Sequence, residues 1–162
     1  MDHVDKVLAQ WHSERPDLDV TSMGLVGRLK RTAGHLSQGM GKTFAGFGLN
    51  SASFDVLATL RRSGPPYRLL PSDLLAAMMV TSGTMTNRID QLERAGWVKR
   101  EHNPKDGRSV FISLTDKGFE LIDAAVTAHV KTQDQLTSGL SPTEYETLDR
   151  LLAKFLQSLE NK

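Results

Sequence analysis

The 162-residue chain contains no cysteine. This absence excludes disulfide bonds, thiolate metal sites, cysteine nucleophiles and sensors that work by thiol oxidation. A zinc site would then need histidine and carboxylate ligands, and the five histidines show no close metal-ligand spacing. We therefore expect no metal and no cofactor, and redox sensing through sulfur could use only methionine.

Long hydrophobic runs are also absent. No apolar stretch approaches the ~18 to 20 residues needed to cross a bilayer, and the interrupted N-terminal stretch lacks the basic-then-apolar order of a signal peptide. We expect a soluble, cytoplasmic protein with no membrane partner. Charge of one sign is not in excess either, since 20 Lys and Arg balance 19 Asp and Glu. A nucleic-acid partner must therefore be argued from where the charges lie.

Complete catalytic motifs are missing. Gly41-Lys42-Thr43 resembles the end of a phosphate-binding loop, but Leu36 stands where that loop needs glycine. No nucleophile-elbow sequence occurs, and no serine, histidine and acidic residue cluster along the chain. We expect no catalytic residues and no enzymatic activity.

What the chain does contain is a series of helical patterns in a length that fits one ordinary domain, 1–162. Apolar residues recur at steps of three and four, and capping or turn residues separate the segments. The expected helices are a short one before Pro16, a long one from Met23 to Gly48, and then 50–63, 71–79, 82–95, 115–136 and a last one from about 142. Strand character at 97–102 and 109–114, with turn residues between, predicts a β-hairpin.

This order predicts a mainly α fold with a small β-hairpin wing, a winged helix-turn-helix whose second turn-linked helix enters the DNA major groove. On that helix Met85, Ile89 and Leu92 share an apolar side, and small or polar residues occupy the other side. Asn or Gln can read adenine, Arg can read guanine and Thr offers a methyl or hydroxyl group. The candidate DNA-binding residues of the helix are Ser82, Thr84, Thr86, Asn87, Gln91 and Arg94. The alternative is an ordinary solvated helix face.

The hairpin adds two further candidates. Lys105 and Arg108 lie at or beside its turn, within a wing near residues 102–110 that could reach the minor groove or adjoining phosphates. An exposed hairpin that keeps Lys and Arg for solubility is the other interpretation.

The last helix carries a seam. Its apolar residues alternate steps of three and four, the spacing of a helix that packs on another helix: Tyr145, Leu148, Leu152, Phe155 and Leu159. Packing on the preceding helix of the same chain is one interpretation. We favour a dimer seam, because both end segments are long helices outside the compact helix-turn-helix.

The wing sequence resembles that of the MarR family of bacterial winged helix-turn-helix regulators. Asp106-Gly107-Arg108, followed by Val110 to Thr115, is similar to the family's Asp-x-Arg…Leu-Thr signature, and Ser82 to Arg100 matches in pattern. The resemblance covers roughly residues 20–160. It implies a homodimer built by segments 1–48 and 115–162, which places the DNA-binding regions, 49–114, on a palindromic operator. Many members have a second Arg where this chain has Gly107.

A narrower resemblance, to the urate-responsive branch of the family, rests on Gln10-Trp11, on Glu14 to Asp19, on Phe54 to Leu57 and on Thr84 to Arg88. It implies a repressor released by a small anionic aromatic effector such as urate, and the ligand residues carried over are Trp11, Asp55, Arg88 and Arg100.

Each of these four residues has an ordinary alternative. Trp11 could dock the short helix, Asp55 could be a solvated carboxylate on the polar side of its helix, and Arg88 could bind phosphate. Arg100 shares strand parity with Val98, but Trp97 makes either face of the strand a possible inner one, so the direction of Arg100 stays open. If the assignment holds, an Asp55–Arg88 pair broken by the anion would shift the helix that carries Asn87, and ligand binding would weaken DNA binding by linkage. A winged-helix module that binds protein without a ligand response is the alternative function.

Overall fold

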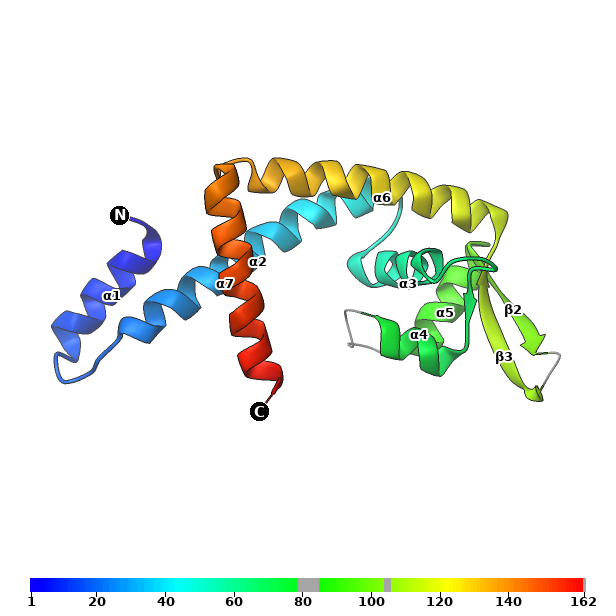
Figure 1. Ribbon diagram of the computed structural model, residues 1–162, viewed down its shortest axis with the longest axis horizontal. Coiled ribbons are helices and arrows are strands. Elements are labelled where there is room, and N and C mark those ends of the chain that lie inside the picture. The colour runs from blue at the N-terminus through cyan, green and yellow to red at the C-terminus, as the bar shows by residue number, and fades with distance from the viewer. Residues whose placement is uncertain (79–84, 104–105, 162) are drawn as a thin grey trace. The chain divides into compact units, whose positions relative to one another are not determined.

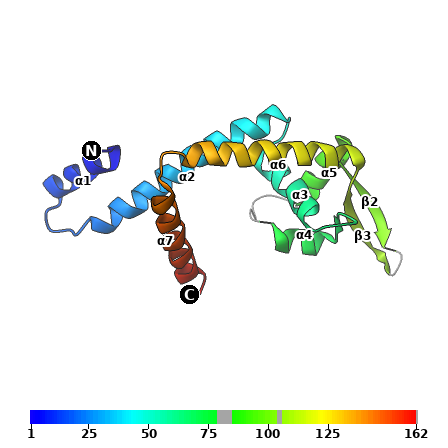
Figure 2. The ribbon, with the colours of Figure 1, turned by 45° about the horizontal axis from the view of Figure 1, so that its top comes forward.

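The computed structural model describes residues 1–78, 85–103 and 106–161 of the chain. The described chain divides into two compact units, Met1–Gly39 and Met40–Lys162, and the division falls within helix α2, Thr21–Gly46. Figures 1 and 2 show the order of the elements. Each unit is described by itself below.

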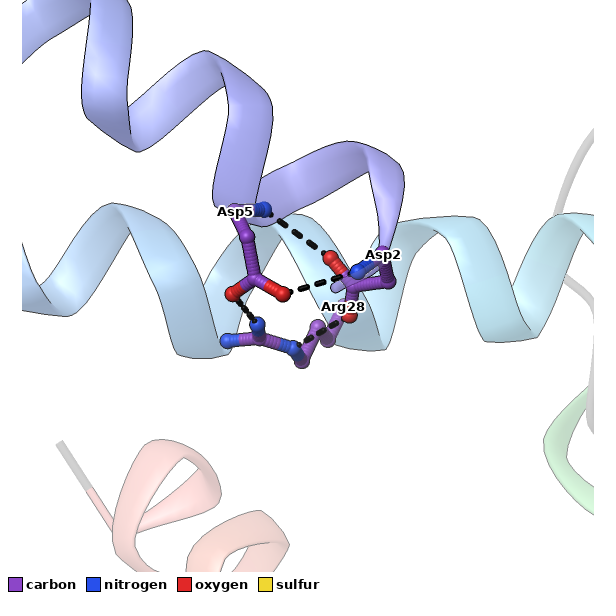
Figure 3. A network of polar contacts seen from close by, with 3 residues as sticks. All are labelled: Asp2, Asp5 and Arg28. Carbon is purple, nitrogen blue, oxygen red and sulfur yellow. Dashed lines mark hydrogen bonds and ion pairs between the residues drawn. The ribbon is translucent and has the colours of Figure 1, made fainter.

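The first unit holds helix α1, His3–Glu14, and the first part of α2. Asp2 and Asp5 form a reciprocal capping box at the start of α1, which satisfies backbone N–H groups that a helix leaves free at its beginning. Arg28 of α2 donates to both carboxylates (Figure 3). Glycine permits close packing on α2, because a Cβ at Gly27 would lie 3.3 Å from a methyl group of Val4. The predicted short helix and the break at Pro16 are confirmed.

The second unit contains helices α3, Ser51–Arg62, α4, Pro71–Ala77, α5, Met85–Arg94, α6, Asp116–Thr137, and α7, Pro142–Glu160. Asn50 caps α3 by accepting a hydrogen bond from the N–H of Ser53 at 2.8 Å, within the predicted helical segment 50–63. Helix α4 ends two residues earlier than predicted. The predicted turn, 80–83, lies outside the described residues.

The wing is a three-stranded antiparallel sheet with the order β1-β3-β2. Strands β2, Val98–Asn103, and β3, Asp106–Leu114, form the predicted hairpin, with Arg100 opposite Ile112 and Asn103 opposite Asp106. Strand β3 therefore begins three residues earlier than predicted. Strand β1, Arg68–Leu69, pairs with Ser113 and Ile112 and was not predicted, because two residues carry no alternation and pairing with distant β3 defines the strand.

The core of the second unit joins these elements. The largest of its completely buried side chains come from α3, α4, α5, β3 and α6: Leu57, Leu60, Leu74, Leu92, Ile112 and Ile122. The apolar side predicted for α5 thus packs inward, which fixes the direction of its opposite side. Figure 1 shows the β2–β3 hairpin extending beyond the helices of this unit. Within the described part of the chain, no helix is both long and apolar enough to span a bilayer.

Candidate DNA interface and ligand site

Helix α5 presents polar side chains to solvent. Ile89 and Leu92 are 3% and 1% exposed, whereas the candidate DNA-binding side chains on the described part of the helix are exposed: Thr86, Asn87, Gln91 and Arg94. Ser82 and Thr84 lie outside the described residues. The polar side of α5 is therefore free, in the chain as described, to approach another molecule.

The base of the wing is tied to α5 by Arg100. Its guanidinium donates to the Asp90 carboxylate at 2.5 Å and also to the Glu93 carboxylate, and its backbone N–H donates to Glu93 Oε1 at 3.1 Å. The hydrogen bond to Asp90 raises the pKa of Arg100, and Glu93 adds to the effect. The direction of Arg100 is thereby settled: it points to α5. On α5, the Asp90 side chain therefore turns to the wing.

The outer face of the sheet carries a second polar network. Glu101 accepts one hydrogen bond from the Ser113 hydroxyl at 2.6 Å and pairs with Lys99 at 2.7 Å. The contact with Lys99 lowers the pKa of Glu101 most, and the hydrogen bond from Ser113 adds to the effect. The guanidinium of Arg68 lies 4.7 Å from the centre of the Phe111 ring.

Of the two wing candidates for DNA binding, Lys105 lies outside the described residues. Arg108 belongs to β3, and its side chain lies outside the part of the chain that the structure describes.

An open pocket of about 310 Å³ lies between α4, α5 and the wing. Most of its wall is apolar, and Ser72, Thr86 and Arg100 supply polar groups. The apolar lining comes from Pro71, Leu75, Met85, Ile89, Val110 and Ile112. Arg100, one of the four ligand candidates, therefore lines a pocket with an apolar wall, a setting that suits a small aromatic anion able to compete with Asp90 and Glu93 for the guanidinium.

Asp55 is buried, at 7% exposure, and the alternative interpretation of a solvated carboxylate on the polar side of α3 is wrong. Helix α3 contacts α4, α5, α6 and β3, so the burial of Asp55 depends on packing that the local pattern does not show. The Asp55 carboxylate pairs with Arg62, whose Nη1 lies 4.0 Å from it. Sequence reasoning missed Arg62, although a separation of seven residues puts both side chains on one side of a helix.

The two remaining ligand candidates differ in setting. Trp11 lies on α1 in the first unit, where its side chain is 41% exposed. Arg88 lies on α5 at the border between its buried and exposed sides and is half-buried. The Asp55–Arg88 pair and the four-residue ligand set stay predictions.

An aromatic cluster was not anticipated. The rings of Phe44 and Phe54 stack at 4.2 Å, and the His129 ring lies 5.1 Å and 4.9 Å from them. Burial lowers the pKa of His129, and within the described structure its Nδ1 has no hydrogen-bond partner. The signal available in the sequence was the spacing of His129 from Ile122 and Ala125, which places it on the buried side of α6.

The described residues bring together no group of three His, Asp or Glu side chains that could hold a metal ion. The arrangement in this part of the chain therefore offers ion pairing, hydrogen bonding and apolar contact.

Comparison with known proteins agrees with the geometry. The sequence model of the MarR family matches residues 49–110. The chain is 41% identical over 158 residues to the helix-turn-helix-type transcriptional regulator PecS of Dickeya dadantii, an alignment that covers 98% of this chain and 95% of PecS.

Two solved structures share the fold. A mutant of MarR from E. coli, in complex with operator DNA, superposes with a TM-score of 0.72 at 27% identity, covering 85% of this chain and 97% of that one. BpsR of Bordetella bronchiseptica, described with regulation of its DNA binding by 6-hydroxynicotinic acid, gives a TM-score of 0.69 at 26% identity and covers 80% of this chain and 90% of that one.

Proposed function

The chain belongs to the MarR family of DNA-binding, winged helix-turn-helix transcription regulators, and from this premise we propose that it is a dimeric repressor of a palindromic operator, released by a small anionic aromatic ligand.

The outward polar side of α5 carries the proposal for DNA reading. Asn87 and Gln91 can each pair with an adenine edge, and Arg94 can contact guanine or phosphate. Thr86 completes the described part of this surface, and Ser82, Thr84, Lys105 and Arg108 would extend it toward the turn and the wing. The fold shared with the E. coli MarR mutant, which is solved in complex with operator DNA, supports this proposal.

The dimer is supported by α7. Every residue of this helix is exposed in the single chain, including the seam residues predicted from the sequence. Such a row of apolar side chains is costly to leave in water. A second copy of the chain would cover it and would set two α5 helices on the two halves of a palindrome.

The pocket beside Arg100 supports the ligand. An incoming anion would compete with the Asp90 and Glu93 carboxylates for the Arg100 guanidinium. If the anion pairs with Arg100, the ion pairs between the base of the wing and the recognition helix α5 are lost. A ligand that binds the state without these ion pairs more tightly than the DNA-bound state weakens DNA binding by the difference between the two affinities. BpsR, whose DNA binding is described as regulated by 6-hydroxynicotinic acid, is a structural relative with a small aromatic acid as its ligand, which supports the ligand class proposed here.

We propose urate as the first effector to test, with Trp11, Asp55, Arg88 and Arg100 as the residues that bind it. The test is a gel-shift titration on a duplex that the wild-type protein selects from a random pool, repeated with urate, other purines and phenolic acids. We expect one of these ligand classes to release the duplex from wild type and to do so at least tenfold less effectively from Arg88→Ala, a loss of about 1.4 kcal/mol in coupling. Release that is equally effective from Arg88→Ala would contradict the proposed role of Arg88.

A further inference from the structure

One arginine of α3 links a buried carboxylate to the last turn of α4. Arg62 donates from Nη2 to the backbone carbonyl of Ala77, the final residue of α4, and its Nη1 lies 4.0 Å from Asp55 Oδ1. Asp55 is almost completely buried, whereas the Arg62 side chain is 47% exposed. The guanidinium therefore bridges an interior charge and a helix terminus.

Both contacts have a physical reason. The last four carbonyl groups of a helix lack partners within the helix, and a cation at that end is favoured by the helix dipole. The carboxylate of Asp55 needs a cation nearby, because burial of an unpaired charge is costly. Seven residues, about two helical turns, separate Asp55 from Arg62, so one side of α3 carries both. The planar guanidinium can serve the two groups with different N–H donors.

The position of this bridge gives it a consequence for DNA binding. Ala77 ends the first helix of the helix-turn-helix, and the chain then continues through residues 79–84 to α5. A change in the charge of the Asp55 carboxylate changes its electrostatic attraction for the Arg62 guanidinium. The hydrogen bond from Arg62 to the Ala77 carbonyl, at the end of α4, changes with it.

We propose that Arg62 is a positioning residue that transmits a change of charge at Asp55 to the end of α4 and so to the affinity of α5 for DNA. In taking Asp55 as a place where a ligand acts, this inference rests on the proposed function. The transmission itself is a property of the chain without ligand.

Arg61 provides a matched control on the same helix. Its Nε donates to Asp123 Oδ1 at 2.8 Å, and its guanidinium lies 4.5 Å from the Phe119 ring centre. These contacts connect α3 to α6 and not to α4. Arg61→Gln removes the same charge and the same volume from the neighbouring position.

The experiment is a double-mutant cycle on the affinity for the selected duplex, without ligand. Asp55→Asn should change the Kd about fivefold or more, the lower end of ordinary coupling between sites. In an Arg62→Gln background the same substitution should change the Kd less than it does in wild type, by a factor larger than the roughly twofold departure from additivity that independent sites show. In the Arg61→Gln background the fivefold effect should persist. Arg62→Lys, which keeps a cation that can reach the carbonyl, should restore part of the effect. Equal effects of Asp55→Asn in all backgrounds, or none in wild type, would overturn the proposal.

Hydrogen exchange gives a second readout that needs no Asp55 variant. The Met78 N–H donates to the Leu74 carbonyl in the last turn of α4. Arg62→Gln should accelerate exchange there about tenfold or more, and Arg61→Gln should leave it unchanged. Unchanged exchange in Arg62→Gln would equally overturn the proposal.

A urate titration separates this inference from the proposed function. Urate should release the duplex from Arg61→Gln as it does from wild type and should need at least about fivefold higher concentration with Arg62→Gln. If urate fails to release wild type, the effector assignment fails, while the cycle and the exchange rates still decide the role of Arg62.

Discussion

Arg100 joins strand β2 to helix α5 through a single side chain. It belongs to β2 by sequence, yet its guanidinium contacts two carboxylates of α5. Its side chain is 35% exposed, so solvent screens these ion pairs and moderates their contribution. Without Arg100, Asp90 and Glu93 would repel each other on the same helix.

The first prediction concerns this tie. Arg100→Gln should lower the free energy of unfolding by about 1 kcal/mol, allowing for screening, and should weaken DNA binding as well. Urea denaturation and gel-shift titration measure the two effects. Arg15→Gln is the control, because Arg15 forms an exposed pair with Asp17 in the first unit, and that variant should match wild type in both assays. An Arg100→Gln protein as stable as wild type would show that the tie contributes nothing.

His129 provides a pH-dependent prediction. Burial lowers its pKa, so the unfolded chain binds this proton more readily than the folded chain does. The contribution of neutral His129 to the free energy of unfolding is complete above the pKa of the unfolded chain, about 6.5. This contribution is lost as the pH falls through the lower pKa of the folded protein. His129→Phe keeps an aromatic ring beside Phe44 and Phe54 and removes the titration. Its unfolding free energy, measured by urea denaturation from pH 7.5 to pH 5, should therefore fall less steeply than that of wild type. Parallel curves for the two proteins would contradict this origin of the pH dependence.

At the scale of elements, the start of α6 is fitted closely to the turn between α5 and β2. Thr115 caps α6 by accepting from the Gly118 N–H at 3.0 Å, and its own hydroxyl donates to the Gly96 carbonyl at 2.7 Å. A Cβ at Gly118 would lie 1.9 Å from the carbonyl oxygen of Trp97. Only glycine allows α6 to start here.

Gly118→Ala should therefore be strongly destabilising. The clash is with backbone, which cannot move aside as a flexible side chain can, and the expected loss in unfolding free energy is about 3 kcal/mol or more. Gly139→Ala, where a Cβ meets nothing within 4 Å, should change it by less than about 0.5 kcal/mol. Thermal and urea unfolding of both variants provide the comparison, and similar losses for the two would refute the packing argument.

Elements also show which predictions a sequence supports. Asn50 and Thr115 are capping residues that act within their own helices, so the starts of α3 and α6 were predictable. Strand β1 and the early start of β3 were not, since pairing between distant segments defines them. Asp55 belongs to the second kind, because its burial depends on what packs over α3.

At the scale of the whole molecule, α7 gives the prediction on assembly. Leu152 and Phe155 are each 39% exposed in the single chain and lie on the predicted seam. Replacing both with Glu should reduce the assembly from a dimer to a species with the 17.9 kDa mass of one chain. Binding to a palindromic duplex should weaken at least about a hundredfold, because two linked contacts become one.

Analytical ultracentrifugation and gel-shift assays measure these outcomes. Lys154→Glu alters charge on the same helix outside the seam and should leave both mass and affinity as in wild type. A wild-type protein that sediments as a single chain would remove the basis of the dimer proposal.

The sequence by itself determined the mainly helical fold with its wing, the apolar and polar sides of α5 and the exclusion of cysteine chemistry, because periodicity, caps and composition act over a few residues. Only the tertiary structure decided that Asp55 is buried beside Arg62, that Arg100 turns to Asp90 and Glu93, and that His129 lies against two phenylalanines. Each of these depends on a partner from another turn or element. For a residue between the buried and the exposed side of a helix, the helical period does not decide which way its side chain points. Its direction is decided by the partner that tertiary packing places beside it.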